Sequence, residues 1–595
     1  MIDNHQLVRG GKHSFKYPDY ILTNRAQELL ISGGIISQQE TSQDLLKRVI
    51  STLFSLDDSF GTHTANTKKA ADNFISYVVE GSVMLGTPIL TNAGRYETPL
   101  SSCAVVPVDL QELNSKTKER ICAYHKQNMG TGFNLTRYEN PVAILNWINE
   151  LSAQETATGQ YDRYIGNMGL LHISHPFIRE FISAKRFRDM NHFNISVDVT
   201  EDFMNKAELE EPFTLSNGNS VLARDLLMSI AENAWHNGDP GLIFLERMNN
   251  DNPVSAMSKY VSTPPCAEMG LIEGETCHFG YINLSKVLRK KGHITEIDYD
   301  KLAKITQLLI RVLDNAIEYS IPRYPTAMSR DIAQQNRRVG IGICGLADML
   351  LACQLPYDSQ EARDLARDVL SFINYTSKSA SVTLAEQRGS CSAMDFPQTN
   401  RYLSGSYLED KYGRNPTRTV SSQEWAQLAV HIRSTGKLRN ISTTALPPTG
   451  RASILLEATP SIEPIFSIFA SDGSIQPIVI DLLSNALEGQ EFLLEQVCQE
   501  ASNSGSFQGI EVLPVSTREC LKTAKEISSL AHIQMIAHLA GVQGVIDESA
   551  SKTVNLPYQA SVDDIKELFL LSYRLGLKNI SVYRDKTKVD QPINL

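Results

Sequence analysis

The segment 262–270, STPPCAEMG, places a cysteine directly after two prolines and two residues before a glutamate. Neither Pro264 nor Pro265 can donate a backbone hydrogen bond to a sheet, so this segment is not a central strand. We expect a stiff, extended loop in which residues two apart point to the same side, so that Cys266 and Glu268 share one face. A carboxylate is rarely buried without a partner, so we expect Glu268 to be either paired or functional.

A cysteine considered by itself is more often a small core residue than a nucleophile. The same holds for Cys103 in LSSCAVV and Cys277 in GETCHFGYINLS, which each enter a strand-like apolar run. The nine cysteines include no CxxC pair and no matching histidine pair, which disfavours a zinc finger or ribbon. A disulfide framework is also not expected in so long a chain without a secretion signal.

Two further stretches could contact phosphate groups. GIGICG, residues 340–345, matches the GxGxxG pattern, but the polar DIAQQNRR precedes it where a dinucleotide fold needs a hydrophobic strand. Close backbone packing at a helix start explains it better. In LPPTGRASILLEA, residues 446–458, small and hydroxyl residues at a helix start leave backbone N–H groups available for a phosphate. This stretch is not a Walker loop, because it has no GxxxxGK[ST], and on its own a plain N-cap explains it.

Composition restricts the class of protein. The 595 residues carry a net charge of −11, with 42% hydrophobic and 21% charged residues, which is typical of a globular chain with a large core. The basic stripe of a general nucleic-acid binder is missing. MIDNHQLVRGGKHSFKY lacks the apolar core of a signal peptide, and the most apolar segment, 339–355, is short and contains Asp348. We expect a soluble, cytoplasmic protein that binds neither nucleic acid nor a membrane.

Periodicity predicts the elements that must position these residues. Residues 1–80 are expected to be helical and peripheral, and short apolar strands then alternate with amphipathic helices, of which 298–320 is the clearest. Residues 551–585 are typical of a strand–helix–strand unit in which Ser561 caps the helix. One large α/β domain over residues 81–595, preceded by the small helical region, is the simplest account.

Taken together, these stretches resemble the catalytic subunit of ribonucleotide reductase, in particular its adenosylcobalamin-dependent class II type. The resemblance runs from about residue 20 to about residue 585 and rests on ordered blocks that include TPILTNAG…LSSC, GTGFNLTR, GNMGLLHISHPFIREFI, FNISVDVTEDFM, GDPGLIFLERMNNDNP, PPCAE, ETCHFGYINLS, RRVGIGICGLADML, LPPTGRASI and SKTVNLP…ISVYRD. It implies a ten-stranded α/β barrel with a central finger loop that carries a radical cysteine at its tip. The matching residue here is Cys266.

The resemblance also implies roles for residues. A thiyl radical on Cys266 would remove the 3′ hydrogen of a ribonucleotide, and Glu268 would act as general base on the 3′ hydroxyl. Cys103 and Cys277 match the pair that supplies two electrons and closes a disulfide, so their Cα atoms must lie within about 7 Å. The radical must come from a cofactor, and the C-terminal strand–helix–strand unit points to adenosylcobalamin. The substrate-contacting positions match Thr87, Ser101, Ser102, Pro264, Thr449, Gly450, Arg451, Ala452 and Ser453.

Four features depart from the family pattern. The family loop reads Asn-Pro-Cys-Gly-Glu and its asparagine binds substrate, whereas this chain has Pro264 there and Ala267 in place of the glycine. ETATGQYDRYIGN, residues 155–167, replaces a basic, glycine-rich loop that couples effector to substrate. HKQNMGTGF lacks the usual glycine run. DKTKVDQPINL has no cysteine pair to relay electrons, so an external dithiol or a thioredoxin-like protein is expected to reduce the active-site pair.

Two hypotheses therefore stay open. In the first, the protein reduces a ribonucleotide, which the retained Cys103 and Cys277 favour. In the second, a radical enzyme of the same fold acts on another nucleotide or sugar without net reduction, which Pro264 and the altered loop favour. A silent nucleotide- or cobalamin-binding protein would leave the four retained residues unexplained. The sequence does not decide the phosphate level, the base, the presence of a nucleotide effector or the formation of a homodimer.

Overall fold

The computed structural model describes residues 15–61, 64–158, 164–186, 189–292, 294–469, 474–487 and 490–587. Three sequence predictions therefore fall partly outside the described residues: the helical region 1–80, the altered loop 155–167 and the C-terminal segment 585–595. Within the first of these, the structure has the helices α1 (Asn24–Ser32), α2 (Ser42–Ser55) and α3 (Thr64–Val79) and the 3₁₀ helix η1 (Leu56–Phe60).

Ten strands form one mixed sheet. They are β1 (Val83–Leu85), β2 (Cys103–Val105), β3 (Gly130–Asn134), β4 (Asn167–His172), β5 (Phe193–Asp198), β8 (Gly241–Ile243), β9 (Thr276–Asn283), β12 (Val339–Cys344), β13 (Thr553–Leu556) and β14 (Asn579–Arg584). Hydrogen bonding follows the order β1–β9–β2–β3–β4–β5–β8–β14–β13, and β12 pairs with the opposite edge of β9. The sheet order therefore departs from the chain order at β9, β12 and β14.

Isolated bridges close this sheet into a ring. One joins Ile341 of β12 to Thr444, and the next joins Leu446 to Ala550, just before β13. Hydrogen bonding thus continues from β12 through residues 444–446 to the last strands of the chain. The ten-stranded α/β barrel that the sequence predicted is confirmed.

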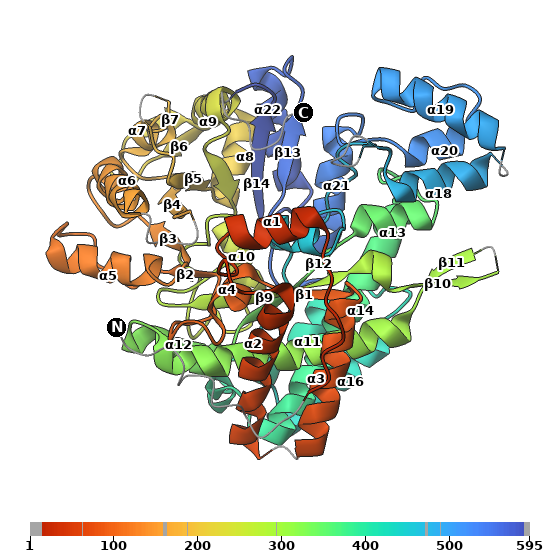
Figure 1. Ribbon diagram of the computed structural model, residues 1–595. Coiled ribbons are helices and arrows are strands. Elements are labelled where there is room, and N and C mark those ends of the chain that lie inside the picture. Colours follow the sequence, from red (N-terminus) through yellow and green to blue (C-terminus); the bar gives the residue numbers. More distant parts are fainter. Residues whose placement is uncertain are drawn as a thin grey trace.

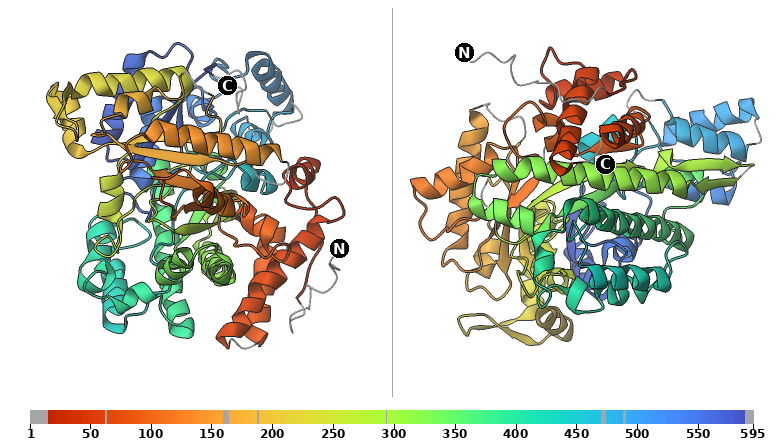
Figure 2. Two further views of the ribbon diagram at one scale, coloured as in Figure 1. Left: turned by 90° about the vertical axis from the view of Figure 1, so that its left-hand side faces the viewer. Right: turned by 90° about the horizontal axis from the view of Figure 1, so that it is seen from below.

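Helices cover the outside of the barrel (Figures 1 and 2). Parallel neighbours such as β3 and β4 need crossover connections, which helices supply. The helices are α4 (Thr87–Asn92), α5 (Ser115–His125), α6 (Pro141–Ala157), α7 (Ile178–Ile182), α8 (Glu201–Leu209), α9 (Ala223–Asn237), α10 (Leu245–Asp251), α11 (Tyr299–Ser320), α12 (Ala327–Asn336), α13 (Leu346–Ala352), α14 (Gln360–Arg388), α15 (Arg401–Ser404), α16 (Ser422–Thr435), α17 (Gly450–Leu455), α18 (Pro477–Ala486), α19 (Glu491–Ser504), α20 (Val515–Cys520), α21 (Ser529–Ala540) and α22 (Val562–Arg574).

The clearest predicted elements form where periodicity and capping agree. Helix α11 has its N-cap at Asp298, whose side chain accepts from the Lys301 amide, and it packs against α2, α3 and α14. The predicted strand–helix–strand unit is β13–α22–β14, with its two strands paired in parallel. Ser561 caps α22 by accepting from the amide of Asp564, whose carboxylate bonds back to the Ser561 amide. Both predictions are confirmed.

The glycines of GIGICG serve close packing within a strand. Gly340 and Gly342 lie in β12 itself, where an added Cβ would stand 2.7 Å from the Phe279 ring and 2.9 Å from Pro447, respectively. Gly345 has a φ of +73° and begins α13. The predicted packing role is confirmed, and it extends into the strand before the helix. In the part of the chain that the structure describes, no helix is long and apolar enough to cross a membrane.

Candidate active site

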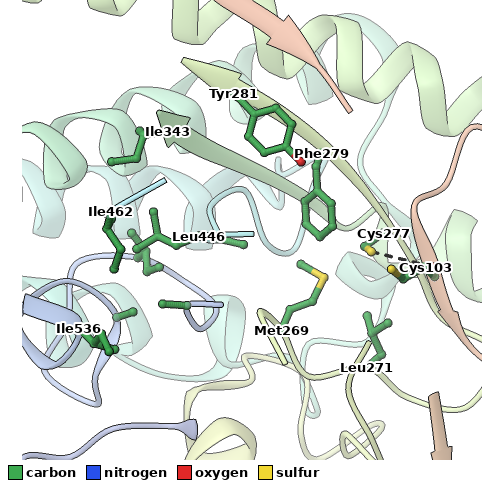
Figure 3. Packing of buried hydrophobic residues seen from close by; sticks show 14 of the residues in the cluster. Cys103, Met269, Leu271, Cys277, Phe279, Tyr281, Ile343, Leu446, Ile462 and Ile536 are labelled. Carbon is green, nitrogen blue, oxygen red and sulfur yellow. Dashed lines mark hydrogen bonds between the residues drawn. The ribbon is translucent and has the colours of Figure 1, made fainter. Parts of the chain in front are cut away.

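Cys103 and Cys277 lie directly opposite each other on the antiparallel strands β2 and β9. Opposed residues of such a pair have Cα atoms about 4.5–5.5 Å apart, which is within disulfide reach. The two cysteines are not joined in a disulfide, and they are only 4% and 0% exposed. In Figure 3 the two sulfurs lie beside each other, and the Cys277 Sγ is 3.9 Å from the Cys103 carbonyl oxygen. The predicted proximity is confirmed.

The segment around Cys266 is a tight turn, so the extended backbone that the sequence predicted is wrong. The Ala267 amide donates to the Pro264 carbonyl oxygen at 3.0 Å, which leaves Pro265 and Cys266 as the central residues of the turn. The fixed φ of proline suits the first of these positions. The argument from an extended backbone therefore does not apply, and a shared face for the thiol and the carboxylate stays a prediction. Cys266 is exposed, whereas Glu268 is buried at 2% exposure.

The residue after the cysteine has a left-handed backbone. Ala267 has a φ of +56°, a conformation that costs an L-residue about 1–2 kcal/mol and glycine almost nothing. The family loop carries glycine at this position. The chain therefore keeps the left-handed turn despite the substitution, and contacts around the loop must compensate.

Two asparagines from neighbouring parts of the barrel hold this turn. Asn194, on β5, donates from Nδ2 to the Pro265 carbonyl oxygen at 2.8 Å. Asn579, the first residue of β14, donates from Nδ2 to the Ala267 carbonyl oxygen. The peptide group before Cys266 and the one after Ala267 are thus anchored to strands. Sequence reasoning missed both residues, because nothing local marks an asparagine that bonds a distant loop.

Glycines in β3 let the finger loop approach the cysteine pair. A Cβ added to Gly130 would stand 3.1 Å from both the Cys103 Sγ and the Pro265 Cγ, and one added to Gly132 would stand 2.2 Å from the Thr263 carbonyl oxygen. The turn at Cys266 and the thiol pair therefore belong to one site. The alternating glycines of GTGF are a sequence signal for this close approach.

The Glu268 carboxylate acts electrostatically on Cys277. Burial, the contact with Cys103 and the nearby negative charge of Glu268 together raise the pKa of the Cys277 thiol well above its usual value. The Glu268 carbonyl oxygen accepts from the Ser549 amide at 2.9 Å, which fixes the backbone behind the carboxylate. At neutral pH, Cys277 is therefore a protonated thiol that can donate hydrogen.

Comparison with known proteins identifies the family of this chain. Residues 101–583 match the family model described as the ribonucleotide reductase barrel domain. The chain belongs to this family. It is 31% identical over 544 residues to a vitamin B12-dependent ribonucleoside-diphosphate reductase of Thermoplasma acidophilum, a match that covers 85% of this chain and 64% of that protein. It is 27% identical over 582 residues to the Mycobacterium tuberculosis protein of the same name, which covers 93% and 77%, respectively.

A solved structure of the ribonucleotide reductase family shares the fold. The alpha subunit of the Actinobacillus ureae class Id ribonucleotide reductase superposes with a TM-score of 0.73 at 20% identity, covering 96% of this chain and 99% of that chain. Identity at this level supports the fold alone.

The predicted phosphate-binding segment starts helix α17 of the reductase barrel. Thr449 stands at the N-cap, yet its hydroxyl accepts from the Ser461 amide at 2.8 Å instead of capping the helix. The expected plain side-chain cap is therefore not formed. Gly450 is exposed, and Arg451 donates to the Gly33 carbonyl oxygen at 3.0 Å. The other two predicted residues of this segment, Ala452 and Ser453, are buried.

Of the four other predicted substrate residues, Pro264 lies in the turn before Cys266, and Thr87 and Ser102 border the thiol pair. Thr87 is half-buried at the start of α4, and a Cβ on the preceding Gly86 would stand 3.5 Å from the Ser102 Oγ. The Ser102 amide donates to the Cys277 carbonyl oxygen at 2.9 Å. The structure therefore brings Thr87 and Ser102 to the cysteine strands.

Ser101 is placed differently. Its hydroxyl bonds the Tyr324 hydroxyl and lies 3.3 Å from the His278 Nε2. Adjacent strand residues face opposite sides, so His278 points away from the side of β9 that carries Cys277. The structure does not bring Ser101 to the thiol pair, and its predicted substrate contact stays a prediction.

A buried ion network supports the backbone behind Glu268. Lys378 pairs with Asp547 at 2.7 Å, and Lys578 donates to the Glu548 carbonyl oxygen at 2.7 Å. Burial by itself would raise the pKa of Asp547, but the charge of Lys378 holds it well below its usual range. These contacts fix residues 547–549, which include the amide that binds the Glu268 carbonyl group. No sequence motif marked this network.

Proposed function

We propose that this protein reduces ribonucleotides to 2′-deoxyribonucleotides by a thiyl-radical mechanism. The observation that carries the proposal is the pair of opposed, buried thiols at Cys103 and Cys277, beside the turn that exposes Cys266. A pair of thiols in disulfide register can deliver two electrons to one substrate. A radical reaction without net reduction would not require this pair of thiols.

The first step uses the loop residues. A thiyl radical at Cys266 removes the hydrogen atom from C3′ of the substrate. The Glu268 carboxylate accepts the proton of the 3′ hydroxyl, a role that needs a positioned base beside the reacting carbon. The 2′ hydroxyl then takes up a proton and leaves as water.

The second step uses the opposed pair. Cys103 and Cys277 together give two electrons and two hydrogens, and their sulfur atoms join in a disulfide. Cys266 returns its hydrogen atom to C3′ and is ready to act again. One ribonucleotide and two thiols thereby yield one deoxyribonucleotide, one water and one disulfide. The high pKa of Cys277 keeps its proton in place until it is needed.

We infer adenosylcobalamin as the radical source. The relatives from Thermoplasma and Mycobacterium are named vitamin B12-dependent. The loop fits such a group in one respect, because Cys266 is exposed at the tip of a turn whose flanking carbonyls are already bonded, so a bulky partner can reach the thiol. When bound, adenosylcobalamin supplies the radical that removes the hydrogen atom of this thiol.

The substrate is proposed to be a ribonucleoside diphosphate, as in the names of those relatives. Its phosphates would lie at Thr449–Ser453. The Tyr281 hydroxyl donates to the Pro448 carbonyl oxygen at 3.3 Å, just before this segment. Tyr281 is four residues along β9 from Cys277, and Figure 3 shows both side chains on that strand. The separation of about 13 Å suits a nucleotide lying along β9 with its ribose at the thiols.

The reductant is proposed to be a dithiol small or slender enough to enter the barrel. At 4% and 0% exposure, Cys103 and Cys277 are out of reach of the flat face of a folded protein. The disulfide must be reduced again after each turnover, which fits a protein of the cytoplasm, where disulfides are kept reduced. A nucleotide effector and a homodimer are compatible with this proposal, which does not depend on either.

A single-turnover experiment tests the proposed function. Fully reduced protein, freed of external thiol, is mixed anaerobically with adenosylcobalamin and a ribonucleoside diphosphate. The proposal expects close to one deoxynucleotide per chain and a new disulfide that peptide mapping assigns to Cys103 and Cys277. Product without that disulfide would refute the role of the pair.

A further inference from the structure

The two carbonyl groups that flank Cys266 are held from opposite sides by side-chain amides. Asn194 on β5 holds the carbonyl oxygen of Pro265, and Asn579 on β14 holds that of Ala267. Strand β8 lies between β5 and β14, so the turn is fixed to both flanks of one part of the barrel. The direction of the Cys266 side chain follows from the peptide groups around it. Asn194 bonds the peptide before Cys266, the Ala267 amide of the peptide after it donates to the Pro264 carbonyl oxygen, and Asn579 bonds the next peptide along the chain.

A second hydrogen bond restrains the Asn579 side chain. Its Nδ2 also donates to the Ser549 Oγ at 3.0 Å, and the residue is only 7% exposed. The Ser549 amide binds the Glu268 carbonyl oxygen. One asparagine thereby connects the residue after the proposed radical thiol with the backbone of the proposed base.

The conformation of Ala267 shows why such a support is needed. A left-handed alanine is disfavoured and would relax to another conformation if nothing held it. Relaxation at Ala267 would turn the Cys266 thiol and shift Glu268. A displacement of about 1 Å at a reacting group can reduce turnover about a hundredfold.

We propose that Asn194 and Asn579 are positioning residues that aim the Cys266 thiol, and that Asn579 holds Ala267 in its left-handed conformation. The proposal rests on the function proposed for Cys266. It assigns a task to two amides that act through the loop backbone. It also explains how the turn tolerates alanine where the family loop has glycine.

The test compares Asn194→Ala, Asn579→Ala and the double variant Asn579→Ala/Ala267→Gly with the parent protein. Each single variant should lower kcat about ten- to a hundredfold while KM stays near the parent value, because substrate groups are untouched. Glycine takes the left-handed conformation freely, so Ala267→Gly should restore about tenfold of the kcat lost in Asn579→Ala. A merely structural role of Asn579 would not be repaired by a change at residue 267.

Asn400→Ala is the matched control for a buried asparagine. Asn400 is 0% exposed and its Nδ2 donates to the Ala393 carbonyl oxygen at 3.0 Å, in a separate hydrophobic cluster. This variant should lower the melting temperature and leave kcat unchanged. Asn194 has an exposed side chain, so Asn194→Ala should fold even if Asn579→Ala is poorly stable.

The rate at which iodoacetamide alkylates Cys266, followed by peptide mass spectrometry, reports the conformation of the loop and does not require catalytic turnover. This rate should rise severalfold in Asn579→Ala and return toward the parent rate with Ala267→Gly. This readout tests the positioning proposal even if the parent protein shows no reductase activity, so the two failures are distinguishable. Unchanged alkylation and unchanged kcat in both single variants would overturn the proposal, as would a kcat loss that Asn400→Ala reproduces.

Discussion

Cys103 on β2 and Cys277 on β9 form a directly opposed pair of residues in an antiparallel ladder. The ladder fixes both Cα atoms at a separation that suits a disulfide, whichever redox state the sulfurs are in. The pair can therefore cycle between dithiol and disulfide without moving a strand. Neither strand could shift by one residue without turning its cysteine to the other face of the sheet.

Replacing either cysteine should stop repeated turnover. Cys277→Ser removes one of the two hydrogen donors, so we expect less than one deoxynucleotide per chain, measured by product counting with excess dithiothreitol. Cys344→Ser is the matched control, since Cys344 is also 0% exposed on an adjacent strand, with its Sγ 3.9 Å from the Ile282 carbonyl oxygen. Multiple turnovers by Cys277→Ser would contradict the assignment of the reducing pair.

Glu268→Gln should slow the chemical step while substrate still binds. The amide keeps the size of the side chain but cannot accept the proton of a 3′ hydroxyl, so we expect kcat to fall about a hundredfold or more. Nucleotide affinity, measured by equilibrium binding, should change little. Turnover near the parent rate would show that another group acts as the base.

The Cys277 thiol should resist alkylation at mildly alkaline pH. Its pKa is raised by burial, by Cys103 and by the charge of Glu268, so the reactive thiolate is scarce even near the ordinary cysteine pKa. In folded protein we expect slow iodoacetamide labelling of Cys277 up to about pH 9, followed by peptide mass spectrometry. Urea-unfolded protein provides the fast reference rate. Rapid labelling of the folded protein at pH 8 would contradict the raised pKa.

Acid should destabilise the barrel through His278. Burial and the nearby charge of Arg337 lower the pKa of His278 to about 3, whereas in the unfolded chain it is about 6.5. The stabilisation from keeping this imidazole neutral is present above pH 6.5 and is lost as the pH falls, by about 1.4 kcal/mol per pH unit. When the pH is lowered from 6.5 to 5.5, the melting temperature of His278→Asn should therefore fall less than that of the parent protein. An equal fall in the melting temperature of both proteins over this pH range would exclude this contribution.

Local patterns in the sequence were sufficient for individual helices and strands, whereas the barrel and the grouping of the site residues followed from the family resemblance. The 3.6-residue periodicity of 298–320 and the cap at Ser561 are set by neighbouring residues, and both elements form as predicted. The proximity of Cys103 and Cys277 followed from the resemblance, whose ordered blocks fix the sheet order that periodicity cannot supply.

The turn at Cys266 could not be predicted in the same way. Two prolines suggested an extended loop. The turn was not expected, because the left-handed state of Ala267 is improbable for an isolated alanine. The asparagines that bond this turn, Asn194 and Asn579, come from β5 and β14, and no local pattern connects them to the loop. The outward placement of Ser101 likewise depends on the tertiary partners of its hydroxyl group.

The most direct measurement of the central claim is a mass-spectrometric assay of parent and Cys266→Ala protein. Each is incubated anaerobically with adenosylcobalamin, dithiothreitol and the four common ribonucleoside diphosphates. The account predicts that the parent protein yields nucleotides lighter by one oxygen atom and that Cys266→Ala yields none. Unchanged or isomerised nucleotides with the parent protein, or deoxynucleotides from Cys266→Ala, would contradict thiyl-radical ribonucleotide reduction at Cys266.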